Sequence, residues 1–305
     1  PELLTRDHVA RCIVNQIKAG KGSPHGGVFL DIAWIKEHLP NAEAHIKKKL
    51  PSMYHQFKEL AGIDITKEPM EVGPTTHYAM GGIHVDADTQ MSTVSGLFAA
   101  GECAAGLHGA NRLGGNSLSD LLVFGNRAGE HAALHAKEYA HTDIPDETIS
   151  DLQKEALAPL ERFEELGEDA QGPYQIQYEL QDFMQAQVGI VRVEAEMKDA
   201  VGKIDELRER AEKVGACGNR EYNPGWHTAL DLHNLLTVAE AATLAGIERK
   251  ESRGAHFRED YQEKSEEFAQ VNMIISKQPD GTMALRRDPI KTQTDNQKSI
   301  IEENK

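Results

Sequence analysis

The stretch HGANRLGGNSLSD, residues 108–120, combines a glycine-rich loop, one arginine and the start of a strong helix. A helix that begins near Asn116 or Ser117 presents free backbone N–H groups and the positive end of its dipole. Such a terminus favours a negatively charged group, and the glycines let a flat ligand lie against the backbone. Arg112 can grip a carboxylate with its planar guanidinium group. The stretch therefore predicts a binding site, rather than only a capped helix behind a surface loop.

The composition of the chain limits its partners. The 305 residues include 49 acidic and 33 basic side chains, which give a net charge of −16. This balance argues against nucleic acid, which would require a basic face. Cys12, Cys103 and Cys217 show neither a CxxC spacing nor a metal-ligand spacing, so they indicate a reducing compartment. No run of about 18 apolar residues occurs, and we expect no signal peptide. We expect a soluble chain that continues upstream, because it opens with Pro1 rather than methionine.

Hydrophobic patterns and turn residues predict the order of the elements. Helices are expected over residues 5–18, 32–38, 42–62 with a break at Pro51, 117–140 and 226–246, and a short strand follows Gly27. Residues 69–101 read as short strands, and residues 271–288 as a hairpin that turns at Pro279, Asp280 and Gly281. The tail after Pro289 is polar and expected to be loose.

One helical region carries a regular apolar seam. Its residues recur at alternating steps of three and four, namely Ile190, Val193, Met197, Ala200, Ile204, Leu207, Ala211 and Val214. Such spacing places all of them on one side of a helix. It predicts core packing in a helix hairpin or bundle.

Three further segments carry candidate functional residues. In TVSGLFAAGE, residues 93–102, an apolar strand ends at a glycine followed by Glu102, whose carboxylate can accept hydrogen bonds from sugar-like hydroxyls. In THYAMGG, residues 76–82, His77 precedes a double glycine and can donate to a carboxylate beside Arg112. In TRD, residues 5–7, Arg6 follows a predicted N-cap, Thr5, and by itself would only form an ion pair on the helix surface.

Together these motifs resemble the flavoprotein subunits of succinate dehydrogenase and fumarate reductase. The segments TRDHVAR, HYAMGG, GLFAAGE, HGANRLGGNSLSD and ESRGAHFRED occur here in the order typical of that family. The resemblance reaches from the start of the chain to about Pro289. Some of the motifs also occur in L-aspartate oxidase, but the double glycine and the acid of GGNSLSD are more similar to the dehydrogenase.

The resemblance implies a cofactor and a reaction. FAD would be held by Glu102 on its ribitol chain and by the helix start at Asn116, Ser117 and Leu118, where the helix dipole stabilises the reduced ring. His77 and Arg112 would hold a carboxylate of succinate or fumarate. A hydride would pass between the substrate and flavin N5, and Arg6 would carry the proton. The electrons would then leave through an iron–sulfur subunit.

The departures from the family pattern concern the N-terminal half of the cofactor site. The family begins with a Rossmann-type FAD-binding half that carries a GxGxxG loop, and in many members a histidine that attaches FAD covalently. Neither feature is present here, so we expect the chain to be the C-terminal part of such a subunit, with the FAD-binding half missing.

The expected fold class is α+β. Residues 1–70 would form the end of a capping domain, 71–130 the returning strands of a Rossmann-type FAD domain, 131–250 a helical bundle and 251–305 a small C-terminal domain. The chain would be cytoplasmic, lying on the inner face of the cell membrane through its partners and, indirectly, membrane-anchor subunits. Three alternatives stay open: a fumarate reductase, an L-aspartate oxidase that needs no partner subunit, and a non-catalytic fragment that only binds a partner.

Overall fold

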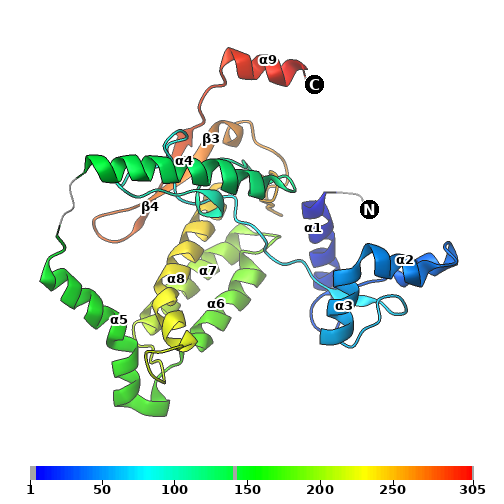
Figure 1. The fold of residues 1–305 in the computed structure, drawn as a ribbon, viewed down its shortest axis with the longest axis horizontal. Coiled ribbons are helices and arrows are strands. Elements are labelled where there is room, and N and C mark those ends of the chain that lie inside the picture. Colours follow the sequence, from blue (N-terminus) through cyan, green and yellow to red (C-terminus); the bar gives the residue numbers. More distant parts are fainter. Residues whose placement is uncertain (1–4, 140–142, 304–305) are drawn as a thin grey trace. The chain divides into compact units, whose positions relative to one another are not determined.

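The computed structural model describes residues 5–139 and 143–303. The chain divides into two compact units, Pro1–Tyr78 and Ala79–Lys305. Figure 1 shows the first in blue to cyan and the second in cyan to red. Helices dominate both units and each contains one two-stranded antiparallel sheet, so the content of the fold is α+β as expected. In the described part of the chain, no helix is both long and apolar enough to span a bilayer.

Unit 1 is built around a small apolar core. Helix α1 covers Arg6–Gln16 and runs into a π-helical turn, Ile17–Lys21. Strand β1, Val28–Leu30, pairs antiparallel with β2, Met70–Val72. Between them lie a 3₁₀ turn at Ala33–Glu37, α2 at Ala42–Lys49 and α3 at Pro51–Leu60. The centre of the core consists of Ile46, Ile65 and Met70.

Two backbone positions explain where the helices of unit 1 stop and start. Gly20 has a φ of 74°, a left-handed conformation that ends the turn after α1. Pro51 occupies the first turn of α3, where its missing N–H costs no helical hydrogen bond. The predicted break at Pro51 and the short strand after Gly27 are both confirmed.

The expected strands of residues 69–101 are only partly present. Apart from β2, the described residues here form isolated bridges, such as Ile83 with Ala104 and Met91 with Phe98. Bends and turns at residues 80, 87–89 and 93–96 interrupt the segment, and the extended residues between them pair only at single bridges rather than in a ladder. The prediction of short strands was therefore wrong for most of the segment.

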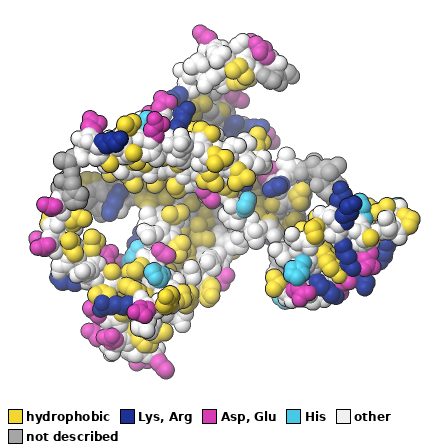
Figure 2. Space-filling model, viewed as in Figure 1, with side chains coloured by type: hydrophobic (Ala, Val, Ile, Leu, Met, Phe, Trp, Pro, Cys, Tyr) yellow, Lys and Arg dark blue, Asp and Glu magenta, His cyan; other side chains and the backbone are white. Residues whose placement is uncertain are grey.

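The long helix of unit 2, α4, covers Asn116–Glu138. It begins after Gly115, whose φ of 86° is left-handed and suits glycine. The predicted helix is confirmed, although its expected end at Ala140 lies outside the described residues. Several of its apolar side chains are exposed, among them Leu118 at 67% and Leu122 at 76%. Figure 2 shows hydrophobic side chains along α4.

The largest core of the protein lies in the helical bundle. Its helices are α5 at Asp146–Leu166, α6 at Pro173–Gln187, α7 at Glu194–Ala211 and α8 at Pro224–Glu248. Helices α6, α7 and α8 pack on one another, and Trp226 of α8 donates from its indole N–H to the Ala156 carbonyl of α5 at 2.6 Å. The predicted seam is confirmed where it falls in α7, since Met197, Ala200, Ile204, Leu207 and Ala211 are all buried in this core.

A β-hairpin follows the bundle. Strands β3, Val271–Lys277, and β4, Met283–Pro289, pair antiparallel, and both pack against α8. The turn contains Gly281 at a φ of 87°, and the Asp280 carboxylate accepts from the Thr282 hydroxyl at 2.6 Å. The predicted hairpin and its turn are confirmed.

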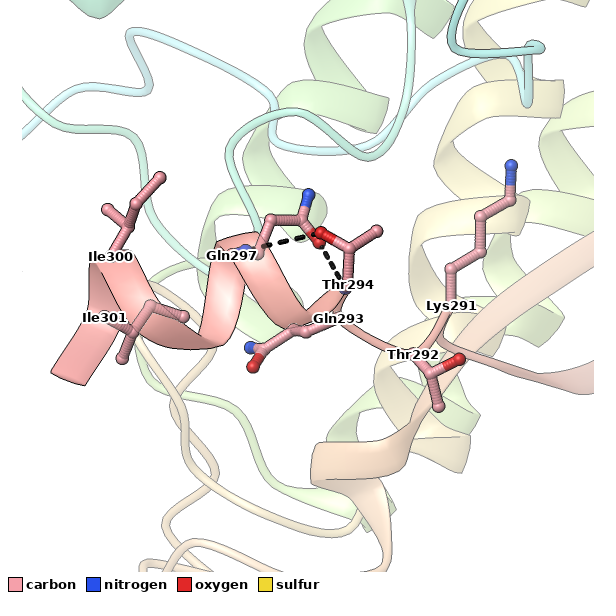
Figure 3. Close-up of a pocket in the computed structure, with 7 residues that line it drawn as sticks. All are labelled: Lys291, Thr292, Gln293, Thr294, Gln297, Ile300 and Ile301. Carbon is pink, nitrogen blue, oxygen red and sulfur yellow. Dashed lines mark hydrogen bonds between the residues drawn. The ribbon is translucent and has the colours of Figure 1, made fainter.

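The tail after Pro289 is more ordered than its polar composition suggests. Residues Asp295–Glu303 form helix α9, whose side chains are exposed. Thr294 and Gln297 cap its first turn reciprocally: the Thr294 N–H donates to Gln297 Oε1 at 2.8 Å and the Gln297 N–H to Thr294 Oγ1 at 3.3 Å (Figure 3). The expectation of a loose tail overlooked this capping box, which is visible in the sequence as Thr-x-x-Gln.

Candidate functional site

The predicted site residues belong to both units. Arg6 and His77 lie in unit 1, whereas Glu102, Arg112 and the start of α4 lie in unit 2. The open hollow shown in Figure 3, lined by residues 291–301 of the tail, contains none of them. The flavin-directed residues, Glu102 and the start of α4, all lie in unit 2.

Arg6 is exposed at the first position of α1. No hydrogen bond or ion pair joins its side chain to any residue within 5–139 or 143–303. The nearest acid in sequence, Asp7, instead binds Arg11 one turn along, with Nη1 at 2.9 Å from Oδ2. Burial raises the pKa of Asp7, but hydrogen bonds from Thr5 and Arg11 outweigh it, so the pKa lies below its usual value. Arg6 therefore does not form the surface ion pair with Asp7 that a purely structural role would involve.

His77 lies on an extended segment close to the end of unit 1, and its side chain is exposed. The segment after it continues into unit 2, where the backbone N–H of Ala79 donates to Glu102 Oε1 at 2.9 Å. The second glycine of the pair that follows is needed for packing, since a Cβ on Gly82 would lie 2.3 Å from the carbonyl oxygen of Cys103, whereas Gly81 has open space at its Cβ position. Within unit 2, the AMGG and GEC segments are therefore held directly against each other.

Glu102 lies on a single 3₁₀ turn, Gly101–Cys103, that packs against the first turns of α4. Gly101 has a φ of 76°, and a Cβ there would meet the Leu121 side chain of α4 at 2.6 Å. The left-handed φ favours the glycine that the sequence places before the acid, and a Cβ there would also displace the Leu121 side chain. It lets an exposed carboxylate sit beside the N-terminal end of α4.

The start of α4 offers backbone donors. Its N-cap is Gly115, which has no side chain to satisfy the amides of the first turn, and that turn contains no acidic residue. Asn116 and Leu118 are exposed and Ser117 is partly buried. The Asn116 and Leu118 amides already donate to the carbonyls of Leu113 and Gly115, each at 3.2 Å, whereas the Ser117 amide has no acceptor among the described residues. The Ser117 amide and the helix dipole can together stabilise a negative charge placed at this end.

The loop that carries Arg112 is closed at its base by a buried pair. His108 and Asp120, the first and last residues of the quoted stretch, lie with Nε2 3.2 Å from Oδ2, and their side chains are 8% and 4% exposed. Arg112 is partly buried and donates from Nη1 to the Leu113 carbonyl at 3.3 Å. The loop glycines 109, 114 and 115 have open space where a Cβ would be.

These features fit a flavin in unit 2. An exposed carboxylate, an available backbone amide at a helix start and an open glycine backbone are the groups that a ribitol chain and a flat, electron-accepting ring require. The sequence interpretation missed the pair of His108 and Asp120. The two residues stand at the two ends of the quoted stretch, which is the one sign of the pair in the sequence. A spacing of twelve residues does not by itself predict a contact.

Two protein families match the chain. Residues 1–118 match the FAD binding domain, and residues 177–300 match the fumarate reductase flavoprotein C-term family. The two matches correspond to the FAD-directed motifs and to the bundle with its hairpin, respectively. FAD is therefore the cofactor of the group of proteins to which the chain is related.

The curated relatives of the chain are flavoprotein subunits of the same kind. The fumarate reductase flavoprotein subunit of Haemophilus influenzae is 36% identical, over 91% of this chain and 45% of its own length. The succinate dehydrogenase flavoprotein subunit of Coxiella burnetii is 37% identical, over 87% of this chain and 46% of its own length. The chain thus spans about half the length of the curated relatives it matches.

Solved structures share the fold. The Mycobacterium smegmatis Sdh1 complex is similar with a TM-score of 0.84 and 46% identity, over 96% of this chain and 48% of that one. A quinol-fumarate reductase with menaquinol molecules is similar with a TM-score of 0.82 and 32% identity, over 95% of this chain and 50% of that one. The motifs, the family matches and these likenesses agree: the chain belongs to the FAD-dependent flavoprotein subunits of succinate dehydrogenases and fumarate reductases.

Proposed function

We propose that the chain works in a succinate dehydrogenase flavoprotein that oxidises succinate to fumarate and passes the electrons to an iron–sulfur subunit. The observation that carries this proposal is the Arg112 loop. A single guanidinium lies on an open glycine backbone directly before the uncapped start of α4. A dicarboxylate and an electron-accepting ring can be bound side by side by such a loop.

The substrate is held by charge-assisted hydrogen bonds. Arg112 grips one carboxylate with two parallel N–H donors, and the exposed imidazole of His77 donates to the same group. A fixed fork of donors orients the dicarboxylate as well as binding it, which a point charge cannot do. Fumarate reduction uses the same contacts in reverse, so the two directions share this part of the site.

FAD supplies the hydride acceptor when it is bound. Glu102 accepts hydrogen bonds from the hydroxyls of the ribitol chain, while Asn116, Ser117 and Leu118 form the first turn of α4 beside the ring, where the Ser117 amide is the available donor among the three. That amide and the helix dipole stabilise negative charge that develops on the ring during the reaction. The glycines of the loop allow the ring to approach the backbone closely.

Arg6 is the proposed proton carrier. Guanidinium groups lose protons only with great difficulty, so the role needs a dry site and a relay. The absence of an Arg6 ion pair among the described residues favours this assignment, because an arginine already bound to Asp7 would have to break that pair first. Here Arg11 occupies Asp7 instead.

Domain roles and partners follow the same proposal. Residues 1–70 form the end of a capping domain, 71–130 the returning part of the FAD domain, 131–250 the bundle and 251–305 the C-terminal domain. The flavoprotein lies on the cytoplasmic face of the membrane through its iron–sulfur and anchor partners. Support comes from the relatives, which include an Sdh1 complex and a quinol-fumarate reductase.

The test is Arg112→Lys in the full-length flavoprotein that contains this chain. Lysine keeps the charge but loses the bidentate contact, so affinity for the dicarboxylate inhibitor malonate should fall at least about tenfold. Arg127→Lys is the matched control, because Arg127 lies on α4, is exposed and contacts only Ala87 and Asp88 among the described polar groups. Unchanged malonate affinity in Arg112→Lys would overturn the assignment. Turnover of L-aspartate instead of succinate would select the oxidase alternative.

A further inference from the structure

The motif ESRGAHFRED, residues 251–260, has no part in the reaction proposed above. The segment connects α8 to the hairpin and lies entirely in unit 2. Two of its charged residues, Glu251 and Arg258, are completely buried. Buried charges are costly unless they are paired and hydrogen-bonded, so the contacts of these two residues show what the segment holds in place.

Glu251 holds the beginning of the 251–260 segment in place through hydrogen bonds. Its carboxylate accepts from Arg249 Nη1 at 2.5 Å, from Arg253 Nε at 3.0 Å and from the Ser265 N–H at 2.9 Å. Burial raises the pKa of Glu251, but the hydrogen bonds from Arg253, Ser265 and Arg249 outweigh it and hold the pKa below its usual value. The carboxylate therefore stays ionised and fixes Arg253.

Arg258 holds the end of the 251–260 segment in place through hydrogen bonds. Its Nε and Nη2 donate to the two carboxylate oxygens of Asp260, each at 2.8 Å. Its Nη1 donates to the carbonyls of Gly246 and Ile247 in the last turn of α8, at 2.8 and 3.1 Å. A cation at these carbonyls satisfies the end of the helix. The segment is thus tied to the end of α8, which is part of the bundle core.

Between these two anchors the backbone forms a tight turn that touches the Arg112 loop. Arg253 and His256 exchange backbone hydrogen bonds at 2.8 and 3.1 Å, with Gly254 between them at a φ of 60°. At the tip of the turn, the Ala255 N–H donates to the Ala110 carbonyl at 2.9 Å. A Cβ on Gly254 would lie 2.4 Å from that same oxygen, so only glycine allows this contact.

Ala110 lies two residues before Arg112. The glycines of the loop at 109, 114 and 115 are surrounded by open space, so packing against them does not fix the loop. The pair of His108 and Asp120 closes its base. The contact at Ala110 is a separate anchor that lies nearer to the arginine.

We infer that the turn at Gly254 and Ala255 is a positioning element that sets the place of the Arg112 guanidinium for substrate. The inference rests on the proposed function. The buried ion pairs of Glu251 and Arg258 make the turn rigid, and the hydrogen bond from Ala255 to Ala110 transmits that rigidity to the loop. Misplacement of a binding group by about 1 Å is enough to cost on the order of 10²-fold in rate.

The experiment compares Gly254→Ala with Gly281→Ala in the full-length flavoprotein. Both glycines have a positive φ in unit 2, so both variants carry similar backbone strain, but Gly281 has no atom near its Cβ position. Gly254→Ala should weaken malonate binding and lower kcat/KM for succinate about tenfold or more, with flavin content retained. Gly281→Ala should bind malonate like the parent protein. Equal malonate affinity in the two variants would overturn the inference.

A milder variant keeps the inference testable if Gly254→Ala does not fold. Arg253→Lys loses the forked contact with Glu251 and should loosen the turn. Amide hydrogen exchange at Ala255 should then accelerate together with a loss of malonate affinity. Faster exchange with unchanged affinity would show that the turn is only structural. If Arg112→Lys also leaves malonate binding unchanged, the proposed function itself fails; if Arg112→Lys alone weakens it, only the positioning role fails.

Discussion

His108 and Asp120 form a buried pair across the base of the Arg112 loop, with Nε2 of the imidazole 3.2 Å from a carboxylate oxygen. The histidine precedes the loop and the aspartate belongs to the second turn of α4. Because the carboxylate can only accept, the ring N–H donates to it. The pair joins the entry of the loop to the helix that follows, and so fixes the two ends between which the arginine lies.

Asp120→Ala should destabilise the chain through this pair. Removing a buried acceptor leaves a desolvated donor and typically costs about 1–3 kcal/mol. Asp151→Ala is the control, because the pair of Asp151 with Lys154 has side chains 68% and 76% exposed and should contribute only about 0–1 kcal/mol. Urea unfolding of the two variants measures the difference. Equal free energies of unfolding would contradict a supporting role for the pair.

The chain alone should not bind FAD tightly. It matches the FAD binding domain over residues 1–118 but spans about half of its relatives, and it lacks a GxGxxG loop for the pyrophosphate. The flavin absorbance of the purified chain after incubation with FAD and gel filtration measures this. A stoichiometric yellow protein would show that residues 1–305 hold the cofactor without the other half.

Arg6→Ala in the full-length flavoprotein should abolish turnover in both directions. Loss of a proton carrier costs on the order of 10²–10⁴-fold, while His77 and Arg112 still hold malonate. Arg6→Lys should recover little activity, because its compact charge misplaces the proton. Arg127→Ala is the control, since Arg127 is exposed and contacts only Ala87 and Asp88 among the described polar groups. Activity of Arg6→Ala within a few-fold of the parent would show that Arg6 has only a structural role on the surface. Parallel losses of turnover and malonate affinity would show that Arg6 binds substrate rather than carrying the proton.

Stability should fall on mild acidification because of His256. Burial, and next the charge of Arg192, lower the pKa of His256 from 6.5 to about 4. Between these two values the unfolded chain binds more protons than the folded one, so stability decreases as the pH falls from about 6.5 to about 4, by at most about 3 kcal/mol.

The measurement compares urea unfolding of the parent and His256→Gln at about pH 7 and about pH 5. Glutamine can donate to the Arg249 carbonyl and accept from Arg192 as the neutral imidazole does, but it does not titrate in this range. The variant should therefore lose most of the acid sensitivity. His233→Gln, at a histidine that is 44% exposed, should retain it. The same pH dependence in both variants would rule out His256 as its source.

Local patterns were sufficient for much of the fold. The apolar seam of α7, the break at Pro51 and the hairpin turn at Gly281 were predicted correctly, because each depends on residues a few positions apart. The capping box at Thr294 and Gln297 was equally local and was overlooked. The strands expected between residues 69 and 101 mostly failed, because a strand requires a pairing partner that its own sequence does not specify.

The sequence by itself determined the family, since the motifs and their order are chain properties that need no coordinates. It also supplied the residue types of the site: an arginine on a glycine loop, an acid after a strand and an uncapped helix start. Only the tertiary structure decided which side chains support that loop. The contacts of His108 with Asp120 and of Ala110 with Ala255 join residues 12 and 145 positions apart. Contacts over such separations depend on how helices and turns pack, and no local periodicity encodes them.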